Sequence, residues 1–392
     1  MIKFDYDEVH KDLKENQIDV IAVATSHWHA VGIDAFLYDI SKDLERKFKG
    51  LIIIYPHQKN GLLISEKDFS SCDFADLKFY VVDEPDNKNF VSRLSNWIFC
   101  YLNVLSGLNN IRSTNGMNKL YLASPLHPHL PFLKQFTDTA IAYKYDPVFV
   151  LIDEGFGTYA SKNTWKLVLK QENKSSSLYL LKAMYLLKSM IFISVEHIFR
   201  KLVLKYVICT NRFLFKKEDQ LKINENISWS YKEVLKHRKN DLRIDKAKKT
   251  ALLVTQPFSE YNQISLLEEL RLIESIVKFF NKKGIKPLLK PHPRERSDKY
   301  DDLSGCDFEI LKNDYPVEEI IPSLNLFCIV GFTSTALLSS HVLYDIKSIS
   351  LLNIILSMSD DELLNASLED FRNLTSNIIN FVDDVDDINA FI

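Results

Sequence analysis

The sequence predicts an α/β protein of two Rossmann-like halves, and three observations support this. Short continuous apolar runs alternate with amphipathic stretches in two separate parts of the chain, as in parallel sheets covered by helices on both faces. The chain has 392 residues, more than one hydrophobic core usually serves. With 46% hydrophobic residues, 10 glycines and 12 prolines, it is neither a disordered nor a low-complexity chain.

The first half, residues 1–160, contains five apolar runs that we predict to be strands. These runs are residues 19–24, 51–55, 79–82, 120–123 and 148–152. Helical patterns follow the loop that contains His27 and His29, and cover residues 90–106. The alternation of the two patterns predicts a doubly wound domain.

The second half, residues 250–360, repeats this pattern. Strands are expected at residues 251–255, 287–290, 308–311 and 326–330. Residues 265–280 have the apolar spacing of a helix, and Gly284 stands where a helix would end. Residues 361–392 are acidic, and we expect a separate helical segment there, for which packing against the first half is one option.

Residues 161–249 form a basic insert between the two halves, which we expect to be helical. The insert has a net charge of about +13, whereas the rest of the chain has about −16 and the whole chain −3. Its apolar stretch, residues 178–208, includes Arg200, Lys201 and Lys205. Three interpretations stay open: a membrane-surface helix, a groove for an acidic acceptor, and an ordinary solvated helix.

Several classes of protein are excluded by composition and motifs. The small net charge argues against a nucleic-acid-binding protein. Five scattered cysteines include no CxxC pair, which favours a reducing compartment. No secretory leader is apparent, and the uncharged stretch 320–344 is broken by proline and glycine. We therefore expect a cytoplasmic protein, and leave open whether it is peripheral on the inner face of the membrane.

Two adjacent carboxylates follow the fifth predicted strand, where function is concentrated in doubly wound proteins. Asp153 and Glu154 precede two glycines in the sequence DEGFGTY. Neighbouring carboxylates in a partly buried loop can have a raised pKa, as a general base requires. A solvated acidic turn is the alternative interpretation.

A histidine between two prolines follows the predicted strand 287–290. The sequence is Lys290-Pro-His-Pro-Arg-Glu, and the prolines Pro291 and Pro293 restrict the backbone around His292. Lysine, histidine and arginine within five residues form a cationic loop suited to phosphate. We therefore favour a functional loop over a rigid surface turn.

Hydroxyl side chains open the helix that is expected after strand 326–330. Thr333, Ser334 and Thr335 precede an apolar run, so free backbone N–H groups at this helix N-terminus would form an anion site. Serine and threonine are also common helix caps. Glu318 lies in a proline-initiated helical turn, where it would bind ribose hydroxyls or only compensate the helix dipole.

Two pairs of histidines are spaced as metal ligands sometimes are. They are His27 with His29, and His127 with His129. No nearby cysteine or carboxylate completes a site, so we expect acceptor contacts or loop packing rather than a metal. The chain also has no GxGxxG, Walker A, GxSxG or HExxH motif.

Taken in this order, DEGFGTY, KPHPRE and GFTSTAL resemble the three motifs of the bacterial sialyltransferases with a GT-B fold. The capsular polysialyltransferases of glycosyltransferase family thirty-eight are the most similar, followed by the lipooligosaccharide sialyltransferases of family fifty-two. The resemblance implies that Glu154 is the general base, supported by Asp153, and that His292 protonates or hydrogen-bonds the departing CMP phosphate. It also implies phosphate ligands in the HP and Ser/Thr motifs and a ribose ligand: Lys290, Pro293, Thr333, Ser334, Thr335 and Glu318.

The expected function is inverting, metal-independent transfer from CMP-sialic acid that elongates capsular polysialic acid, without a cofactor. An acidic polymer on a lipid primer fits a basic insert, and Arg200, Lys201, Lys205, His27 and His29 are candidate acceptor ligands. The membrane surface and the capsule export machinery are further expected partners, and nucleic acid is not. The alternatives are addition of one sialic acid to lipooligosaccharide, transfer of another capsule sugar, and a non-catalytic polyanion-binding component of capsule assembly.

Overall fold

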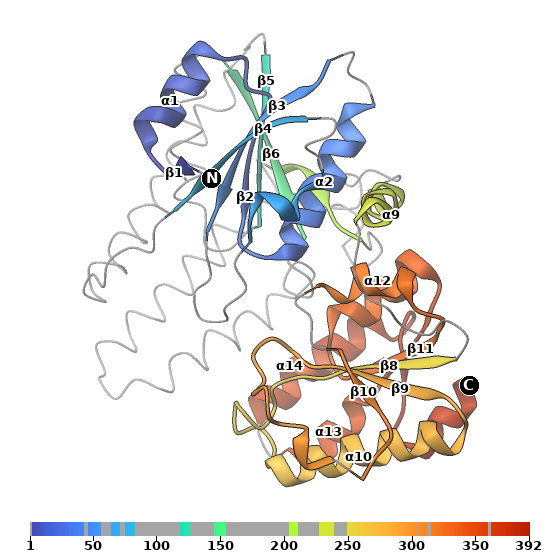
Figure 1. The fold of residues 1–392 in the computed structure, drawn as a ribbon. Helices are drawn as coiled ribbons and strands as arrows, with labels where there is room; N and C mark the ends of the chain where they lie inside the picture. The colour runs from blue at the N-terminus through green and yellow to red at the C-terminus, as the bar shows by residue number, and fades with distance from the viewer. Residues whose placement is uncertain are drawn as a thin grey trace, which may run out of the picture. The chain divides into compact units, whose positions relative to one another are not determined.

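The computed structural model describes residues 2–42, 46–55, 64–70, 75–82, 118–125, 145–153, 204–210, 227–238, 249–303, 305–311, 315–359 and 362–392. The chain divides into two compact units. The first comprises Met1–Thr158 and Val168–Val234, and the second comprises Tyr159–Leu167 and Leu235–Ile392. Each unit is built around one sheet with helices packed on it (Figure 1).

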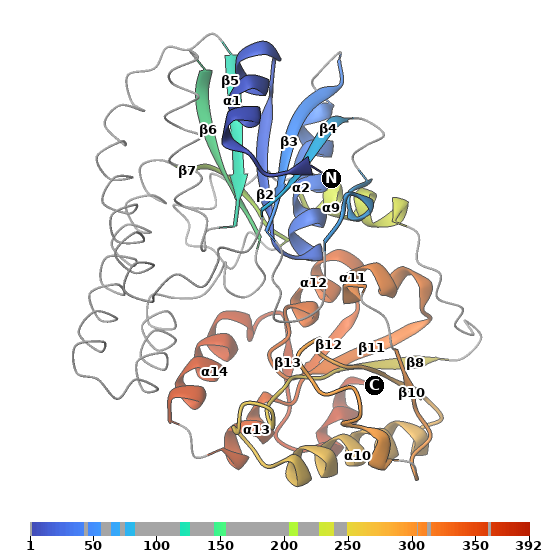
Figure 2. The same ribbon diagram turned by 60° about the vertical axis from the view of Figure 1, so that its left-hand side comes forward.

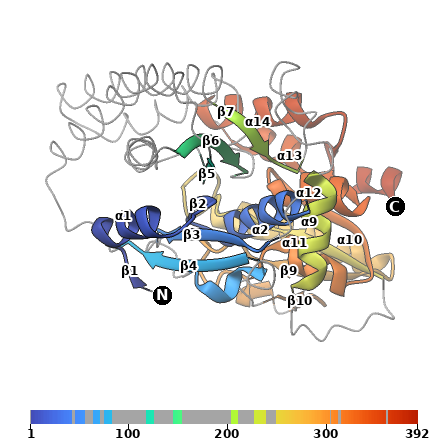
Figure 3. The same ribbon diagram turned by 90° about the horizontal axis from the view of Figure 1, so that it is seen from above.

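The sheet of the first unit is entirely parallel among the described strands. Its order is β1-β4-β3-β2-β5-β6-β7, and Figure 3 shows these strands side by side from β4 to β7. The strands are β1 (Ile2–Lys3), β2 (Val20–Ala24), β3 (Phe48–Ile54), β4 (Ala75–Val81), β5 (Asn118–Ser124), β6 (Tyr145–Ile152) and β7 (Leu204–Ile208). The order reverses between β2 and β5, so the loop after β2 lies at the point where doubly wound sheets bind ligands.

Three described helices and a short 3₁₀ helix belong with this sheet. They are α1 (Tyr6–Glu15), α2 (His27–Ser41), η2 (Glu66–Asp68) and α9 (Ile227–His237), whose residues up to Val234 belong to the first unit. Ser26 caps α2, because its hydroxyl accepts a hydrogen bond from the backbone N–H of His29 at 3.2 Å. The helix therefore starts immediately after β2.

The second unit has a second parallel sheet, which repeats the strand order of the first sheet without its edge strand β1. Its order is β10-β9-β8-β11-β12-β13, with the reversal between β8 and β11. The strands are β8 (Thr250–Val254), β9 (Lys286–Lys290), β10 (Glu309–Ile310), β11 (Leu326–Gly331), β12 (Lys347–Ser350) and β13 (Asn380–Phe381). The loops that follow β8 and β11 are therefore the expected ligand-binding loops of this unit.

Helices cover both faces of the second sheet. Helices α11 and α12 lie on one face and α10 and α13 on the other (Figures 1 and 2). The helices are α10 (Leu266–Lys282), α11 (Val317–Ile320), α12 (Thr335–Tyr344), α13 (Leu352–Met358) and α14 (Glu362–Thr375), with 3₁₀ helices η5 (Asp301–Leu303), η6 (Ile321–Ser323) and η7 (Asp386–Phe391).

Local sequence explains these elements. Every residue of β2 and of β8 is buried, as continuous apolar runs predict for parallel strands covered on both faces. Helix α10 begins with a reciprocal capping box between Ser265 and Glu268. Gly284 follows the helix with a φ of +69°, a conformation that glycine adopts without steric cost.

All nine predicted strands are present, and the described part of the chain contains four further strands that were not predicted. Strands β1 and β13 have only two residues each, too few to show a periodic pattern. Strand β12 has the sequence KSIS, and its buried Ser348 and Ser350 donate hydrogen bonds of 2.6 Å to backbone carbonyl groups. These contacts make a polar strand compatible with burial.

Two segments of the chain contain a strand that we did not expect there. Strand β7 lies within the basic insert that we expected to be helical, and it pairs with β6 in the first sheet. At the C-terminal end, Asn380 and Phe381 of β13 pair with β12, so residues of the expected separate segment complete the second sheet. Sequence pattern missed both strands because β7 is the end of the long apolar stretch 178–208 and β13 has only two residues.

Gly331, at the end of β11, has no space for a side chain. A β-carbon there would lie 2.6 Å from Cγ2 of Val254 and 3.0 Å from the Val254 carbonyl oxygen. We expect Gly331→Ala to reduce the free energy of unfolding by about 1–3 kcal/mol, because the backbone of β8 must shift. Gly305→Ala is the control, since nothing lies within 4 Å of a β-carbon there. Equal unfolding midpoints in urea for the two variants would contradict this expectation.

Candidate active site

The loop after β9 carries His292 in a closed turn. The backbone N–H of His292 donates to Oε2 of Glu295 at 2.7 Å, and the N–H of Glu295 donates to the carbonyl oxygen of His292 at 2.9 Å. The side chain is also fixed, because the N–H of Arg294 donates to Nδ1 of the imidazole at 3.1 Å. Since Nδ1 is an acceptor, the proton of the neutral ring is on Nε2, which can donate to a ligand.

The surroundings of His292 disfavour its protonated form. Burial lowers the pKa of the imidazole below its ordinary value, the carboxylate of Glu295 opposes this, and the cationic Arg294 and Lys290 lower it further. The pKa of His292 is therefore lower in the folded protein than in the unfolded chain, where it is about 6.5. The contribution of His292 to the free energy of unfolding is present above this unfolded value and is lost as the pH falls through the folded-state pKa. An anionic ligand beside the ring would raise the pKa of His292.

Thr255 and Gln256, directly after β8, link the two predicted phosphate motifs. The hydroxyl of Thr255 donates to Oε2 of Glu295 at 2.5 Å, on the His292 side. On the other side, the backbone N–H and hydroxyl of Thr333 both donate to Oε1 of Gln256, at 3.0 and 2.8 Å. The loops after β9 and β11 are thus held on either side of the same two residues.

The Thr333–Thr335 segment forms the start of α12. The hydroxyl oxygen of Ser334 accepts a weak hydrogen bond of 3.3 Å from the N–H of Ala336, and Ser334 is the helix N-cap. Its hydroxyl proton can therefore be directed to a ligand while the oxygen caps the helix. Thr335 is the first residue of the ten-residue helix, where backbone N–H groups favour an anion.

The two glutamates of α11 are buried and make different contacts. Glu318 accepts a hydrogen bond from the hydroxyl of Ser339 in α12, and its backbone carbonyl accepts one from Tyr344. Glu319 makes an ion pair with Arg238, with Oε1 and Nη1 2.5 Å apart. The structure thus places Glu318 beside α12. This helix begins with the Thr333–Thr335 motif, which was predicted to bind the same nucleotide as Glu318.

Asp153 is fully buried at the end of β6. Its carboxylate accepts hydrogen bonds from the backbone N–H and the hydroxyl of Thr210, at 3.3 and 3.4 Å, and its own N–H donates to Ile208 at 2.9 Å. These contacts join the ends of β6 and β7 and fix the position from which the next loop begins. Glu154, the predicted base, lies outside the described residues.

The remaining predicted ligands are dispersed. His27 and His29 are in the first turn of α2, where Nδ1 of His27 lies 2.8 Å from Oδ1 of Asp68 and Nδ1 of His29 accepts from the N–H of Thr25 at 3.2 Å. Burial acts to raise the pKa of Asp68, but the contacts with His27 and Ser65 outweigh it and lower that pKa. Lys205 is in β7, whereas Arg200, Lys201, His127 and His129 lie outside the described residues.

The structure therefore places six predicted residues at the carboxyl ends of β9 and β11 in the second unit. They are Lys290, His292, Pro293, Thr333, Ser334 and Thr335. Sequence reasoning missed the roles of Thr255, Gln256 and Glu295. Thr255 and Gln256 could have been found from their position directly after a predicted buried strand. Glu295 could have been found from its spacing of three residues from His292.

Two kinds of feature are absent from the part of the chain that the structure describes. No group of three or more histidine, cysteine or acidic side chains is arranged to hold a metal ion. No helix there is both long and apolar enough to span a bilayer.

Comparison with known proteins covers both units. A family model described as alpha-2,8-polysialyltransferase (POLYST) matches residues 20–353. The solved alpha/beta-galactoside alpha-2,3-sialyltransferase of Photobacterium phosphoreum aligns over 95% of this chain and 100% of that one, with a TM-score of 0.50 and 12% identity. The UDP-GlcNAc 2-epimerase of Methanocaldococcus jannaschii aligns over 95% and 90%, with a TM-score of 0.50 and 11% identity.

At such low identity, the similarity to these structures concerns the fold alone. It confirms the predicted α/β class with two Rossmann-like units of GT-B type. No curated protein matches this chain in sequence.

Proposed function

Because the chain belongs to the alpha-2,8-polysialyltransferase family, we propose that it elongates bacterial capsular polysialic acid by inverting transfer from CMP-sialic acid. The chain is a glycosyltransferase, and the proposal concerns its donor, its acceptor and the residues involved. The observation that carries it is the closed turn after β9, in which Nδ1 of His292 accepts from Arg294 and Nε2–H is left to contact a phosphate.

On the donor side, the bond between the anomeric carbon and the CMP phosphate oxygen breaks. The sugar becomes oxocarbenium-like, and the departing phosphate gains negative charge. His292 donates through Nε2–H to that phosphate, while Ser334, Thr335 and the N-terminal N–H groups of α12 neutralise it further. Lys290 and Pro293 shape the same loop, and Glu318 is proposed as the ribose ligand. These groups supply the required charge without a metal, so we propose metal-independent transfer.

On the acceptor side, Glu154 is proposed as the general base. It takes the proton of the acceptor hydroxyl as the hydroxyl oxygen attacks the anomeric carbon from the face opposite CMP, which inverts the configuration. Asp153 is proposed to support it through the contacts with Thr210 that fix the start of the loop. We propose that the acceptor is carried on a lipid primer at the cytoplasmic face of the membrane, next to the export machinery.

An acceptor panel tests this function. The protein is incubated with CMP-sialic acid and either oligosialic acid or a galactose-terminated lipooligosaccharide, and the products are separated by length. Growth of oligosialic acid by several residues supports the proposal. Addition of a single residue to the lipooligosaccharide, or no release of CMP with either acceptor, would contradict it.

The basic insert provides a separate expectation about the acceptor. Replacing Arg200, Lys201 and Lys205 together with glutamine should weaken binding of long oligosialic acids and leave CMP affinity unchanged. For these acceptors, the slope of log affinity against log salt should decrease by about 2, because fewer counterions are released from the polyanion. A matched variant, Lys278→Gln on the exposed surface of α10, should keep the slope. If salt and acceptor length have no effect and only membrane association falls, the insert is a lipid anchor.

A further inference from the structure

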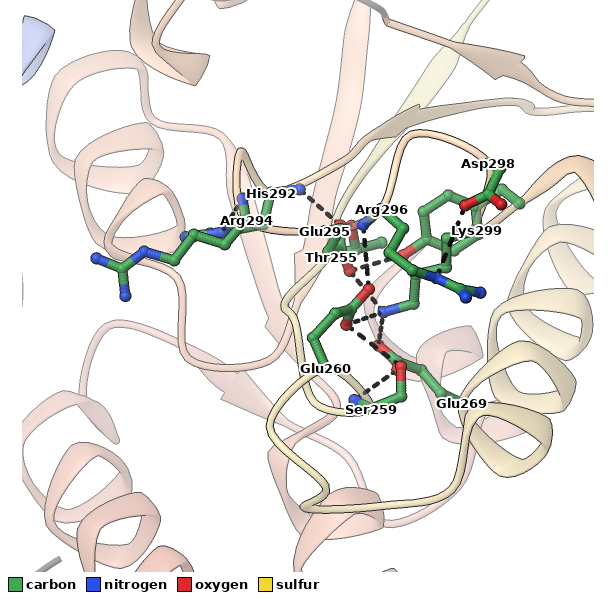
Figure 4. Close-up of polar contacts among 11 residues, drawn as sticks. Thr255, Ser259, Glu260, Glu269, His292, Arg294, Glu295, Arg296, Asp298 and Lys299 are labelled. Atoms are coloured by element: carbon green, nitrogen blue, oxygen red, sulfur yellow. Dashed lines mark hydrogen bonds and ion pairs between the residues drawn. The ribbon is translucent and has the colours of Figure 1, made fainter. Parts of the chain in front are cut away.

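A buried lysine surrounded by three glutamates lies directly beneath the His292 turn. The side chain of Lys299 has no exposed surface, and Nζ lies 2.9 Å from Glu260, 2.8 Å from Glu269 and 3.0 Å from Glu295. Glu269 and Glu295 are also completely buried. Figure 4 shows these carboxylates converging on Lys299, while the Arg294 side chain extends away from them.

Stability alone is a poor explanation for this cluster. Removing charges from water costs several kcal/mol per ion, and a buried ion pair often stabilises a fold no more than apolar side chains would. Three carboxylates also exceed the charge of one ammonium. Burial raises the pKa of Glu269, although Lys299 and Ser259 oppose this effect. Burial also acts to lower the pKa of Lys299, but its contacts with the carboxylates outweigh burial and raise that pKa.

Among the described residues of the cluster, Glu295 is the one with a hydrogen bond to the backbone of His292. Its Oε2 accepts from the N–H of His292 and the hydroxyl of Thr255, and its Oε1 accepts from Lys299 and, at 2.8 Å, from the hydroxyl of Tyr300. Each oxygen thus has two donors, so the carboxylate has one orientation that satisfies all four. Glu269 instead contacts Lys299 and the N–H of Ser259, at 3.0 Å.

We propose that Glu295 is a positioning residue for His292, and that Lys299 holds its carboxylate in place. This inference rests on the proposed function, because it assigns His292 a role in transfer. The turn presents Nε2 of His292 to the donor phosphate only while the N–H of His292 stays bound to Glu295. A displacement of about 1 Å in a catalytic group can cost about 10²-fold in rate, so a loosened turn should affect turnover more than binding.

Glu295→Gln and Glu269→Gln form a matched pair that tests the proposal. Both substitutions remove one buried carboxylate that is paired with Lys299, but only Glu295 contacts the His292 backbone. We expect Glu295→Gln to lower kcat about 10- to 100-fold with the acceptor KM unchanged. Glu269→Gln should stay within about 3-fold of the unmodified protein, because Glu269 contacts Lys299 and Ser259 but makes no direct contact with the His292 backbone. Equal losses of kcat in both variants would overturn the inference.

A double substitution separates positioning from a general structural effect. If Glu295 acts only through His292, then Glu295→Gln should add less than about 2-fold to the loss already caused by His292→Ala. A full additional loss of 10-fold or more in that background would overturn the proposal.

The ionisation of the His292 ring provides a readout that does not depend on activity. The charged groups that act on the pKa of this ring are Glu295 and Glu260, which raise it, and Arg294 and Lys290, which lower it. Because the Glu295 carboxylate favours the protonated ring, Glu295→Gln should lower the pKa of His292 in an NMR titration, and Glu269→Gln should leave it unchanged. An unchanged His292 pKa in Glu295→Gln would overturn the inference. If that pKa shifts as expected but no acceptor is sialylated, the proposed function fails while the contact between Glu295 and His292 stands.

Discussion

His292→Ala is expected to lower sialyl transfer by about 10²- to 10⁴-fold and to weaken CMP binding at the same time. The rate falls because the departing phosphate loses the hydrogen bond that Nε2–H of His292 donates to it. Binding weakens because the same Nε2–H would contact CMP in the product complex. Transfer is measured with radiolabelled CMP-sialic acid, and CMP affinity by calorimetry.

Glu154→Gln is the informative partner for this variant. It should abolish transfer to a similar degree but leave CMP affinity nearly unchanged, because a base acts on the acceptor hydroxyl. Thermal unfolding of both variants should resemble that of the unmodified protein, since loop substitutions usually cost little stability. Near-normal turnover in either variant would remove that residue from the proposed mechanism.

Lys299→Met is expected to have the largest effect on stability, a loss of about 3–5 kcal/mol in the free energy of unfolding. The substitution leaves Glu260, Glu269 and Glu295 without their shared cation in a site where two of them are completely buried. Equilibrium unfolding in urea, followed by circular dichroism, measures the loss.

The loss should depend on pH in a defined direction. Burial already raises the pKa of Glu269, and without the ammonium group this effect is less opposed, so the folded protein binds more protons than the unfolded chain. Stability then falls as pH rises, and Lys299→Met should be more harmful at pH 7.5 than at pH 5. Lys278→Met is the matched surface control, because its pair with Glu274 is exposed, and no measurable change is expected. A loss that is the same at both pH values would contradict this reasoning.

The sequence predicted much of the fold because local patterns report burial directly. Continuous apolar runs such as residues 251–255 occur where a strand is covered on both faces, and β8 is buried at every position. The predicted phosphate residues follow such runs, so their place at the carboxyl ends of β9 and β11 could be predicted as well. Strand β12 could not be predicted, because its buried serines are satisfied by distant carbonyl groups.

Residue pattern by itself therefore determined nine strands of the two sheets, the position of His292 between two prolines after β9, and the hydroxyl-rich start of α12. Only the tertiary structure decided which groups hold that turn. Thr255 and Glu295 are 40 residues apart in sequence, and they meet because β8 and β9 are neighbours in the sheet. Likewise, Glu260 and Glu269 reach Lys299 from different segments. Apolar periodicity reports how a segment is buried, but it does not report which distant charge a buried carboxylate meets, because strand order brings those charges together.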